Sequence, residues 1–114
     1  MNKMLINHGN TLITNAIKVE KEAGENIERL RIAGSLYING SRYLVACGDN
    51  DLRRIKAAGR AALCYQRAGE LDKAWSIMEA VYLSAMRSGR EEMAEAVRTW
   101  LNNVAGYQGF DFYY

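Results

Sequence analysis

The sequence contains no proline, and it has only two cysteines and one histidine among its 114 residues. The absence of proline and the 15 alanines favour helices over a turn-rich β-sandwich, because alanine has the highest helix propensity. Cys47 and Cys64 lie in apolar stretches with no Cys or His at metal-ligand spacing. We therefore expect buried thiols, with a disulfide between them left open, and we expect no metal and no cofactor.

A strong excess of one charge and a long apolar run are also missing. Fifteen Lys and Arg against 13 Asp and Glu leave a net charge of +2, which excludes a histone-like polycation and an acidic disordered tail. No window approaches the roughly 18 apolar residues of a membrane span, and residues 1–10 lack the parts of a signal peptide. We expect a cytoplasmic protein without membrane contact.

A recognisable catalytic signature is absent as well. His8 is the one imidazole, and neither cysteine nor any serine has a nucleophile motif around it. The acidic cluster Glu91, Glu92 and Glu95 has no histidine to join it, and it lies where the first turn of an expected helix favours acids. We therefore expect a protein that is not an enzyme, with no catalytic and no metal-binding residues.

The spacing of apolar residues after Gly48 predicts three helices joined by short turns. They run from Asp51 to about residue 68, from Leu71 through Ala85, and from the capping residues 88–91 to fraying near residues 102–106. Ser88 to Glu91 has the spacing of a capping box at the start of the third helix. Helices joined by short turns pack antiparallel to their neighbours.

The N-terminal half predicts two further helices, one ending near Gly24 and one from Ile27 to about Cys47. Gly34 and Gly40 each cost about 1 kcal/mol inside the second helix, which close approach of a neighbouring helix would offset. A β-hairpin over 36–45, turning at Asn-Gly, is the alternative. The expected fold is all-α, with four or five antiparallel amphipathic helices forming hairpins or a bundle. Residues 1–106 would form one domain, followed by an aromatic tail at 107–114.

Residues 56–82 resemble a tetratricopeptide-repeat hairpin. The likeness is carried by Ala62, Tyr65, Gly69, Leu71, Ala74 and Met78. The pattern departs from that family at Ala58, Ala61, Val81 and Met86, and no second copy occurs at a 34-residue period. The resemblance implies a binding scaffold without chemistry of its own. It also implies that the first helix of the hairpin lines a groove through Lys56, Leu63, Gln66 and Arg67.

A basic stripe is the first candidate binding feature. Five basic and no acidic residues lie between Leu52 and Gly69, and Arg53, Lys56, Arg60 and Arg67 fall within about 60° of one another around a helix. A solvated helix face would explain the position of these charges. It would not explain their single sign, because like charges one turn apart repel. One sign suits an acidic peptide, an acidic partner or a phosphate backbone.

The C-terminal tail is the second candidate. Five of the chain's 11 aromatic residues lie in the last eight positions, among them Phe110, Phe112, Tyr113 and Tyr114. An unattached tail is usually polar. We therefore expect these rings to pack on the chain's own core, or in a groove of a partner or of a second copy in a homodimer.

Together these features predict a small, non-enzymatic protein–protein interaction module: an adaptor, a chaperone-like protein or an inhibitor. Chains of this kind are typical of accessory proteins of bacteria and their viruses. The predicted partner-binding residues are the basic stripe, Leu63, Gln66 and the four tail aromatics. The alternative is a helical nucleic-acid-binding protein that contacts phosphates through the stripe. It ranks second, because the net charge is only +2 and exposed aromatics do not interleave with the stripe.

Overall fold

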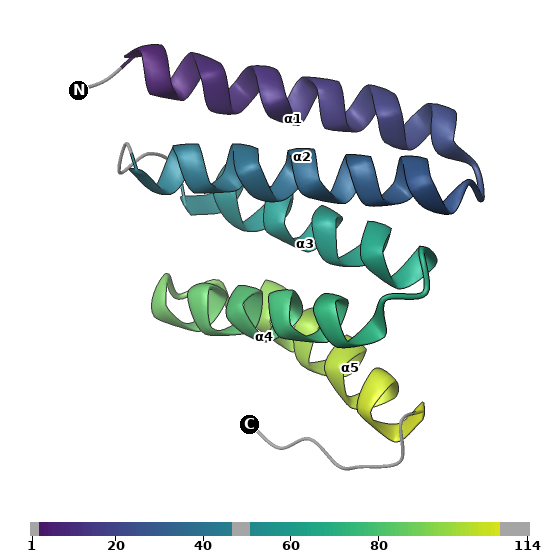
Figure 1. Ribbon diagram of the computed structural model, residues 1–114. Helices are drawn as coiled ribbons and strands as arrows, with labels where there is room; N and C mark the ends of the chain where they lie inside the picture. Colours follow the sequence, from purple (N-terminus) through teal and green to yellow (C-terminus); the bar gives the residue numbers. More distant parts are fainter. Residues whose placement is uncertain (1–2, 47–50, 108–114) are drawn as a thin grey trace.

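The protein is a stack of five helices in the computed structural model, which describes residues 3–46 and 51–107 (Figure 1). They are α1 (Lys3–Ala23), α2 (Ile27–Ala46), α3 (Asp51–Arg67), α4 (Leu71–Arg87) and α5 (Glu91–Tyr107). The described part contains no strand, so the predicted all-α fold is confirmed. The alternative of a β-hairpin at 36–45 is wrong, because these residues lie inside α2. Cys47 lies outside the described residues.

The helices zigzag between two layers. Each helix packs mainly on the one before it and the one after it, so that α1, α3 and α5 share one layer and α2 and α4 share the other. Figure 1 shows α3 and α5 behind α2 and α4. The Cα trace measures 44 × 35 × 17 Å. Its smallest dimension matches two helix layers, since packed helix axes lie about 8–10 Å apart.

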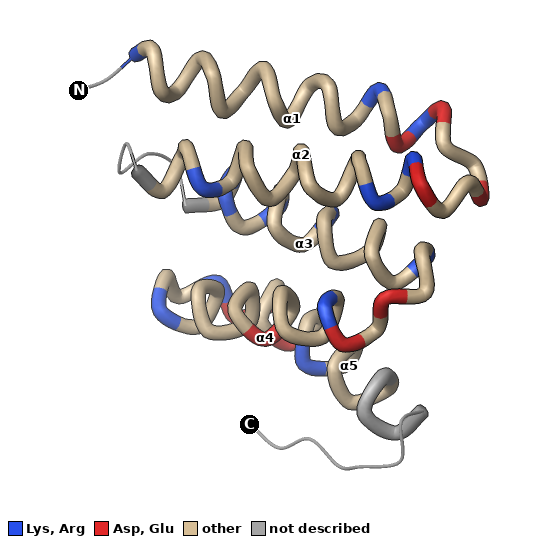
Figure 2. Tube along the Cα trace, viewed as in Figure 1, with Lys and Arg blue, Asp and Glu red and all other residues tan. Residues whose placement is uncertain are grey.

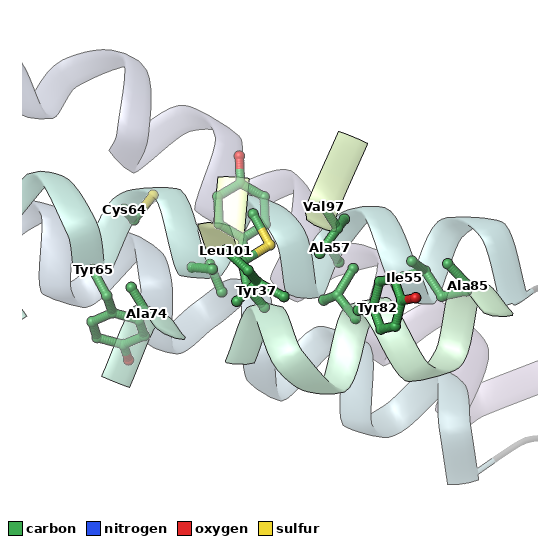
Figure 3. Packing of buried hydrophobic residues seen from close by; sticks show 14 of the residues in the cluster. Tyr37, Ile55, Ala57, Cys64, Tyr65, Ala74, Tyr82, Ala85, Val97 and Leu101 are labelled. Carbon is green, nitrogen blue, oxygen red and sulfur yellow. The ribbon is translucent and has the colours of Figure 1, made fainter. Parts of the chain in front are cut away.

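The core lies between the layers and is rich in alanine. Figure 3 shows Tyr65 beside Ala74 at one end of the core and Tyr82 beside Ile55 at the other. Small side chains let the helix axes approach, and the tyrosine rings fill the remaining space. Cys64 is a free, fully buried cysteine, as predicted. Burial raises the pKa of its thiol to about 11, which leaves the thiol protonated and unreactive at neutral pH.

Two helical glycines sit where a neighbouring element approaches closely. A Cβ on Gly40 would lie 2.9 Å from the carbonyl oxygen of Gly9 and 2.7 Å from the side chain of Ile13. A Cβ on Gly34 would lie 2.9 Å from the ring of Tyr65. Close approach therefore occurs at both glycines, and it offsets the low helix propensity of glycine at these positions.

The α1–α2 hairpin and the α3–α4 hairpin share a turn sequence. Ala-Gly-Glu closes α1 at residues 23–25 and closes α3 at residues 68–70. Gly24 and Gly69 have φ values of +55° and +84°, a left-handed conformation that glycine adopts without strain. After α3, the amide of Glu70 donates to the carbonyl of Tyr65 over 2.9 Å, the backbone bond that completes such a helix end. The chain is thus two similar hairpins followed by α5.

The turn between α4 and α5 is built differently from the sequence-based prediction. The Ser88 hydroxyl donates to the carbonyl oxygens of Ser84 at 2.9 Å and Ala85 at 3.2 Å. Ser88 therefore stabilises the end of α4, and this use of its hydroxyl replaces the expected capping of α5. Acidic residues in the first turn of α5, Glu91 and Glu92, still interact favourably with the helix dipole.

Candidate functional site

A groove of about 450 Å³ opens between α1 and α3. It combines an apolar patch with a cationic border, and we call it the α1/α3 groove. Its lining residues are Ile13, Ile17, Glu20 and Lys21 from α1, Tyr37 from α2, and Arg53, Lys56, Ala57, Arg60 and Arg67 from α3. Figure 2 shows that α3 carries Lys and Arg but no acid from residue 52 to residue 67. Apart from Lys3 at its start, the charges of α1 lie in its C-terminal half (Figure 2).

The two helices that border the groove run parallel, because α2 reverses the chain between them. Arg53 donates to the Asn10 side chain at 2.9 Å, and Arg67 donates to the Gly24 carbonyl at 2.7 Å; both pairs are 43 residues apart in sequence. This constant offset fixes the order of side chains along the groove. Arg53 lies at one end, the apolar patch follows, and Arg60 and Arg67 lie toward the other end.

A buried carboxylate holds the second end of the groove together. Glu20 is 9% exposed. One of its oxygens accepts from the Tyr37 hydroxyl at 2.7 Å. The other accepts from Arg60 at 2.5 Å and from Arg67 at 3.4 Å. Glu20 thus links α1 to α2 and α3, and it engages two of the four arginines and lysines of the predicted basic stripe.

These contacts change the proton affinity of each member of the cluster. Burial by itself would raise the pKa of Glu20, but hydrogen bonds from Arg60 and Tyr37 and the charges of Arg60 and Arg67 outweigh burial and lower it. Burial and the hydrogen bond to Glu20 raise the pKa of Tyr37 to about 12. The hydrogen bond to Glu20 raises the pKa of Arg60. Glu20 is therefore an ionised, fully engaged counter-ion at neutral pH and is poorly suited to act as a general base.

The structure brings the four residues of the basic stripe into one groove. Arg60 and Arg67 share Glu20, which partly explains why α3 tolerates charges of one sign: a carboxylate on another helix offsets them. Lys56 and Lys21 are exposed, and neither makes an ion pair with any described residue. Lys21 was not among the predicted site residues.

The remaining predicted residues lie elsewhere. Leu63 packs against the buried core, and Gln66 accepts a hydrogen bond from the Trp100 indole at 3.1 Å. Of the four positions that the tetratricopeptide resemblance implies, Lys56 and Arg67 line the groove. The tail aromatics Phe110, Phe112, Tyr113 and Tyr114 lie outside the described residues.

Glu20 is the most informative residue that sequence reasoning missed. It follows Ala16 by one helical turn and Ile13 by two turns, so it continues the apolar stripe of α1. A charged residue on an apolar stripe is a signal for a buried charge that needs a partner. Its partners could not be predicted from the sequence, because Arg60 and Arg67 lie 40 and 47 residues further along the chain.

A second groove of about 500 Å³ lies in the other layer, between α2 and α4, and we call it the α2/α4 groove. Its lining residues are Ser35, Ile38, Asn39, Arg42, Tyr65, Asp72, Lys73, Ser76 and Ile77. The Lys73 ammonium lies 4.5 Å from the centre of the Tyr65 ring, a cation–π contact. This groove carries hydroxyl, amide and carboxylate groups as well as cations.

Over the described ranges, no cluster of three or more His, Cys, Asp or Glu residues is placed to hold a metal ion. Within the same ranges, no helix has both the length and the apolar character needed to cross a bilayer. A comparison with protein-family models, with curated proteins and with solved structures finds no match to this chain. The likeness of residues 56–82 to a tetratricopeptide hairpin therefore rests only on the residues that carry it.

Proposed function

We propose that this protein is a non-enzymatic interaction module that binds an acidic segment of another protein in the α1/α3 groove. One observation supports this proposal above all others: five cations surround an apolar patch, and the one carboxylate among them, Glu20, is already engaged. Five positive charges and one negative charge leave a net charge of +4 in the groove. A partner that brings carboxylates and apolar side chains would complement both parts of this surface.

The energetics favour carboxylate partners. Arg60 and Arg67 are half exposed, with 52% and 45% of their side-chain surface accessible, so Glu20 holds them in place without covering them. A guanidinium positioned in this way loses little conformational entropy when it binds a second anion. Charge-assisted hydrogen bonds between guanidinium and carboxylate are roughly twice as strong as neutral ones.

The apolar patch separates this proposal from the nucleic-acid alternative. Ile13 and Ile17 line the groove between its cations, and Ile17 is 42% exposed. Phosphate-backbone binding depends on cations and would leave this apolar surface uncovered. A protein segment with large apolar side chains would remove it from water, which contributes about 25 cal/mol for each Å² buried.

The test uses a random peptide library displayed on phage and selected against the full chain. Two double variants provide the comparison. Lys21→Glu with Lys56→Glu removes the two groove lysines, and Lys18→Glu with Arg87→Glu places the same charge change on exposed residues outside this groove. We expect selected peptides to be rich in Asp, Glu and large apolar residues. We expect the groove variant to weaken binding about tenfold or more and the control variant to weaken it less than about twofold.

Two results would overturn the proposal. One is selection of peptides without acidic residues. The other is an equal loss of peptide affinity in both double variants, which would indicate that peptides are attracted by the net charge of the protein and do not bind in the groove. If a single-stranded oligonucleotide binds more tightly than every selected peptide, and its affinity falls steeply with salt, the nucleic-acid alternative replaces the proposal.

A further inference from the structure

We infer that the segment bound in the α1/α3 groove is an α-helix that presents two acidic side chains seven residues apart, with apolar side chains between them. This inference rests on the function proposed above and specifies the conformation and spacing of the partner. Two features of the groove support it: the kind of hydrogen-bonding groups it offers, and the distance between its cations along α3.

The groove offers hydrogen-bond donors almost exclusively. Its rim consists of Lys and Arg side chains, which donate and cannot accept. Its one carboxylate, Glu20, already accepts from Tyr37, Arg60 and Arg67. Its walls are helices, whose backbone groups bond internally. The backbone N–H groups of a bound peptide would therefore find few acceptors in this groove.

This shortage of acceptors favours a helical partner. An extended peptide carries unpaired N–H and C=O groups, and burying one without a partner costs about 1–3 kcal/mol. Extended peptides usually bind by pairing with a sheet edge, and no strand is present among the described residues. A helix satisfies its backbone groups internally and brings only side chains to the surface. Acidic side chains then offer further acceptors to the exposed cations of the rim.

The spacing of the cations predicts the pattern of the partner. Arg53 and Arg60 are seven residues apart on α3, a rise of about 10.5 Å. Ala57 lies between them, and the parallel register places Ile13 and Ile17 beside this interval. A partner helix that runs along the groove matches it with acidic residues at positions i and i+7 and apolar residues at i+3 and i+4, which share one face.

The test compares three labelled peptides with the same numbers of Glu and Leu residues by fluorescence anisotropy against the full chain. In the first, two Glu residues lie seven positions apart with two Leu residues between them, and a side-chain staple outside this face maintains the helix. The second has the same order without the staple and with two of its residues replaced by D-residues, which prevents helix formation. The third is stapled but has the Glu residues five positions apart, which places them on different faces. We expect the first peptide to bind about tenfold or more tightly than the others.

Each outcome separates this inference from the proposed function. If the first peptide binds best, Arg53→Gln removes its advantage over the third peptide, and Lys21→Glu with Lys56→Glu weakens the binding of all three, both the inference and the proposed function are supported. If all three peptides bind equally and the groove variant weakens the binding of all of them, the groove binds acidic peptides without requiring a helix. The inference about a helical partner is then wrong, and the proposed function stands. If the groove variant and the control variant Lys18→Glu with Arg87→Glu affect all three peptides alike, the proposed function falls as well.

Discussion

The two grooves are similar in size but differ in chemistry. The α1/α3 groove has a volume of about 450 Å³ and the α2/α4 groove about 500 Å³, as expected when each layer leaves a furrow between successive helices. The first carries a net charge of +4 and almost no vacant acceptor. The second sets Arg42 and Lys73 against Asp72 and adds hydroxyl and amide groups. Helix stacking therefore sets the size of a groove, and a few side chains decide what each groove can bind.

The grooves also differ in how their charges are held. In the α1/α3 groove, Arg60 and Arg67 contact the buried Glu20, so binding chemistry and fold stability share the same residues. In the α2/α4 groove, Arg42, Asp72 and Lys73 are all exposed. Charge variants at Arg60 and Arg67 should therefore affect folding, whereas those of the α2/α4 groove should leave it nearly unchanged.

The largest effect is expected from Arg60→Glu. This change places a second carboxylate beside Glu20, which has little solvent to disperse its charge. Removing one member of a fully buried pair costs about 3–5 kcal/mol, and because Arg60 is half exposed we expect about 2 kcal/mol. The matched change in the other groove, Arg42→Glu, should stay within about 0.5 kcal/mol. Urea unfolding monitored by circular dichroism measures the stability of both variants. Equal losses of stability would show that the charges of the two grooves contribute equally to the fold.

Adding a methyl group to a closely packed glycine should give the next largest loss of stability. A Cβ on Gly40 would collide with the groove residue Ile13 and with the backbone carbonyl of Gly9, so Gly40→Ala should destabilise the fold by about 1–2 kcal/mol. At Gly34 an added Cβ meets only the ring of Tyr65 and no backbone atom among its nearest neighbours, so we expect Gly34→Ala to cost less than Gly40→Ala. The control is Gly59→Ala, where an added Cβ meets open space and the higher helix propensity of alanine should stabilise the fold by about 0.5–1 kcal/mol.

Thermal or urea unfolding midpoints of the three variants measure these differences. We expect the midpoint to be highest for Gly59→Ala, lower for Gly34→Ala and lowest for Gly40→Ala. If Gly34→Ala lowers the free energy of unfolding more than Gly40→Ala does, the ring of Tyr65 yields less than the residues around Gly40. Packing beside the α2/α4 groove would then be the more rigid of the two. If Gly40→Ala is as stable as Gly59→Ala, the close approach of α1 to α2 does not constrain the α1/α3 groove.

The helices were largely predictable from sequence because they depend on local patterns. Apolar spacing placed all five. The close contacts that would offset the cost of Gly34 and Gly40 inside α2 are present in the structure. The Asn39–Gly40 pair allowed a hairpin alternative because turn preference is also local. Long-range packing decided between the two, since Gly40 is needed where the backbone of α1 approaches. Spacing likewise placed the basic stripe on one face of α3.

The engagement of that stripe was not predictable. Glu20 meets Arg60 and Arg67 only because α1 and α3 lie parallel at a fixed offset, and no local signal encodes an offset between helices that are not consecutive. Ser88 shows the same limit at short range. Its capping-box spacing predicted a hydrogen bond with Glu91 at the start of α5, but its hydroxyl donates to carbonyl oxygens at the end of α4. A serine between two helices can form either bond, so the sequence alone does not decide between them.

The third prediction concerns acid unfolding and the buried carboxylate that distinguishes the α1/α3 groove. The pKa of Glu20 is lower in the folded chain than the ordinary value of 4.5. In the window between these two values the unfolded chain binds more protons, so the stabilisation from Glu20 is complete above pH 4.5 and is lost as pH falls through the folded pKa. Glu20→Gln should lower stability at neutral pH and flatten its dependence on pH below 4.5. Parallel curves for the two proteins, measured as urea midpoints, would show that Glu20 is not the responsible group.

The smallest effect is expected in the α2/α4 groove, where Lys73 lies over the Tyr65 ring. Cation–π contacts at exposed sites contribute about 0.5–1 kcal/mol, so Lys73→Gln should lower the free energy of unfolding by about 0.5 kcal/mol. Tyr65→Leu keeps an apolar residue of moderate size at the same position and removes the ring. Combining both changes in a double-mutant cycle separates the ring contact from general effects of the lysine. A coupling energy near zero would show that Lys73 covers the ring without stabilising it, and that this cation, unlike Arg60 in the α1/α3 groove, contributes nothing to the fold through its contact.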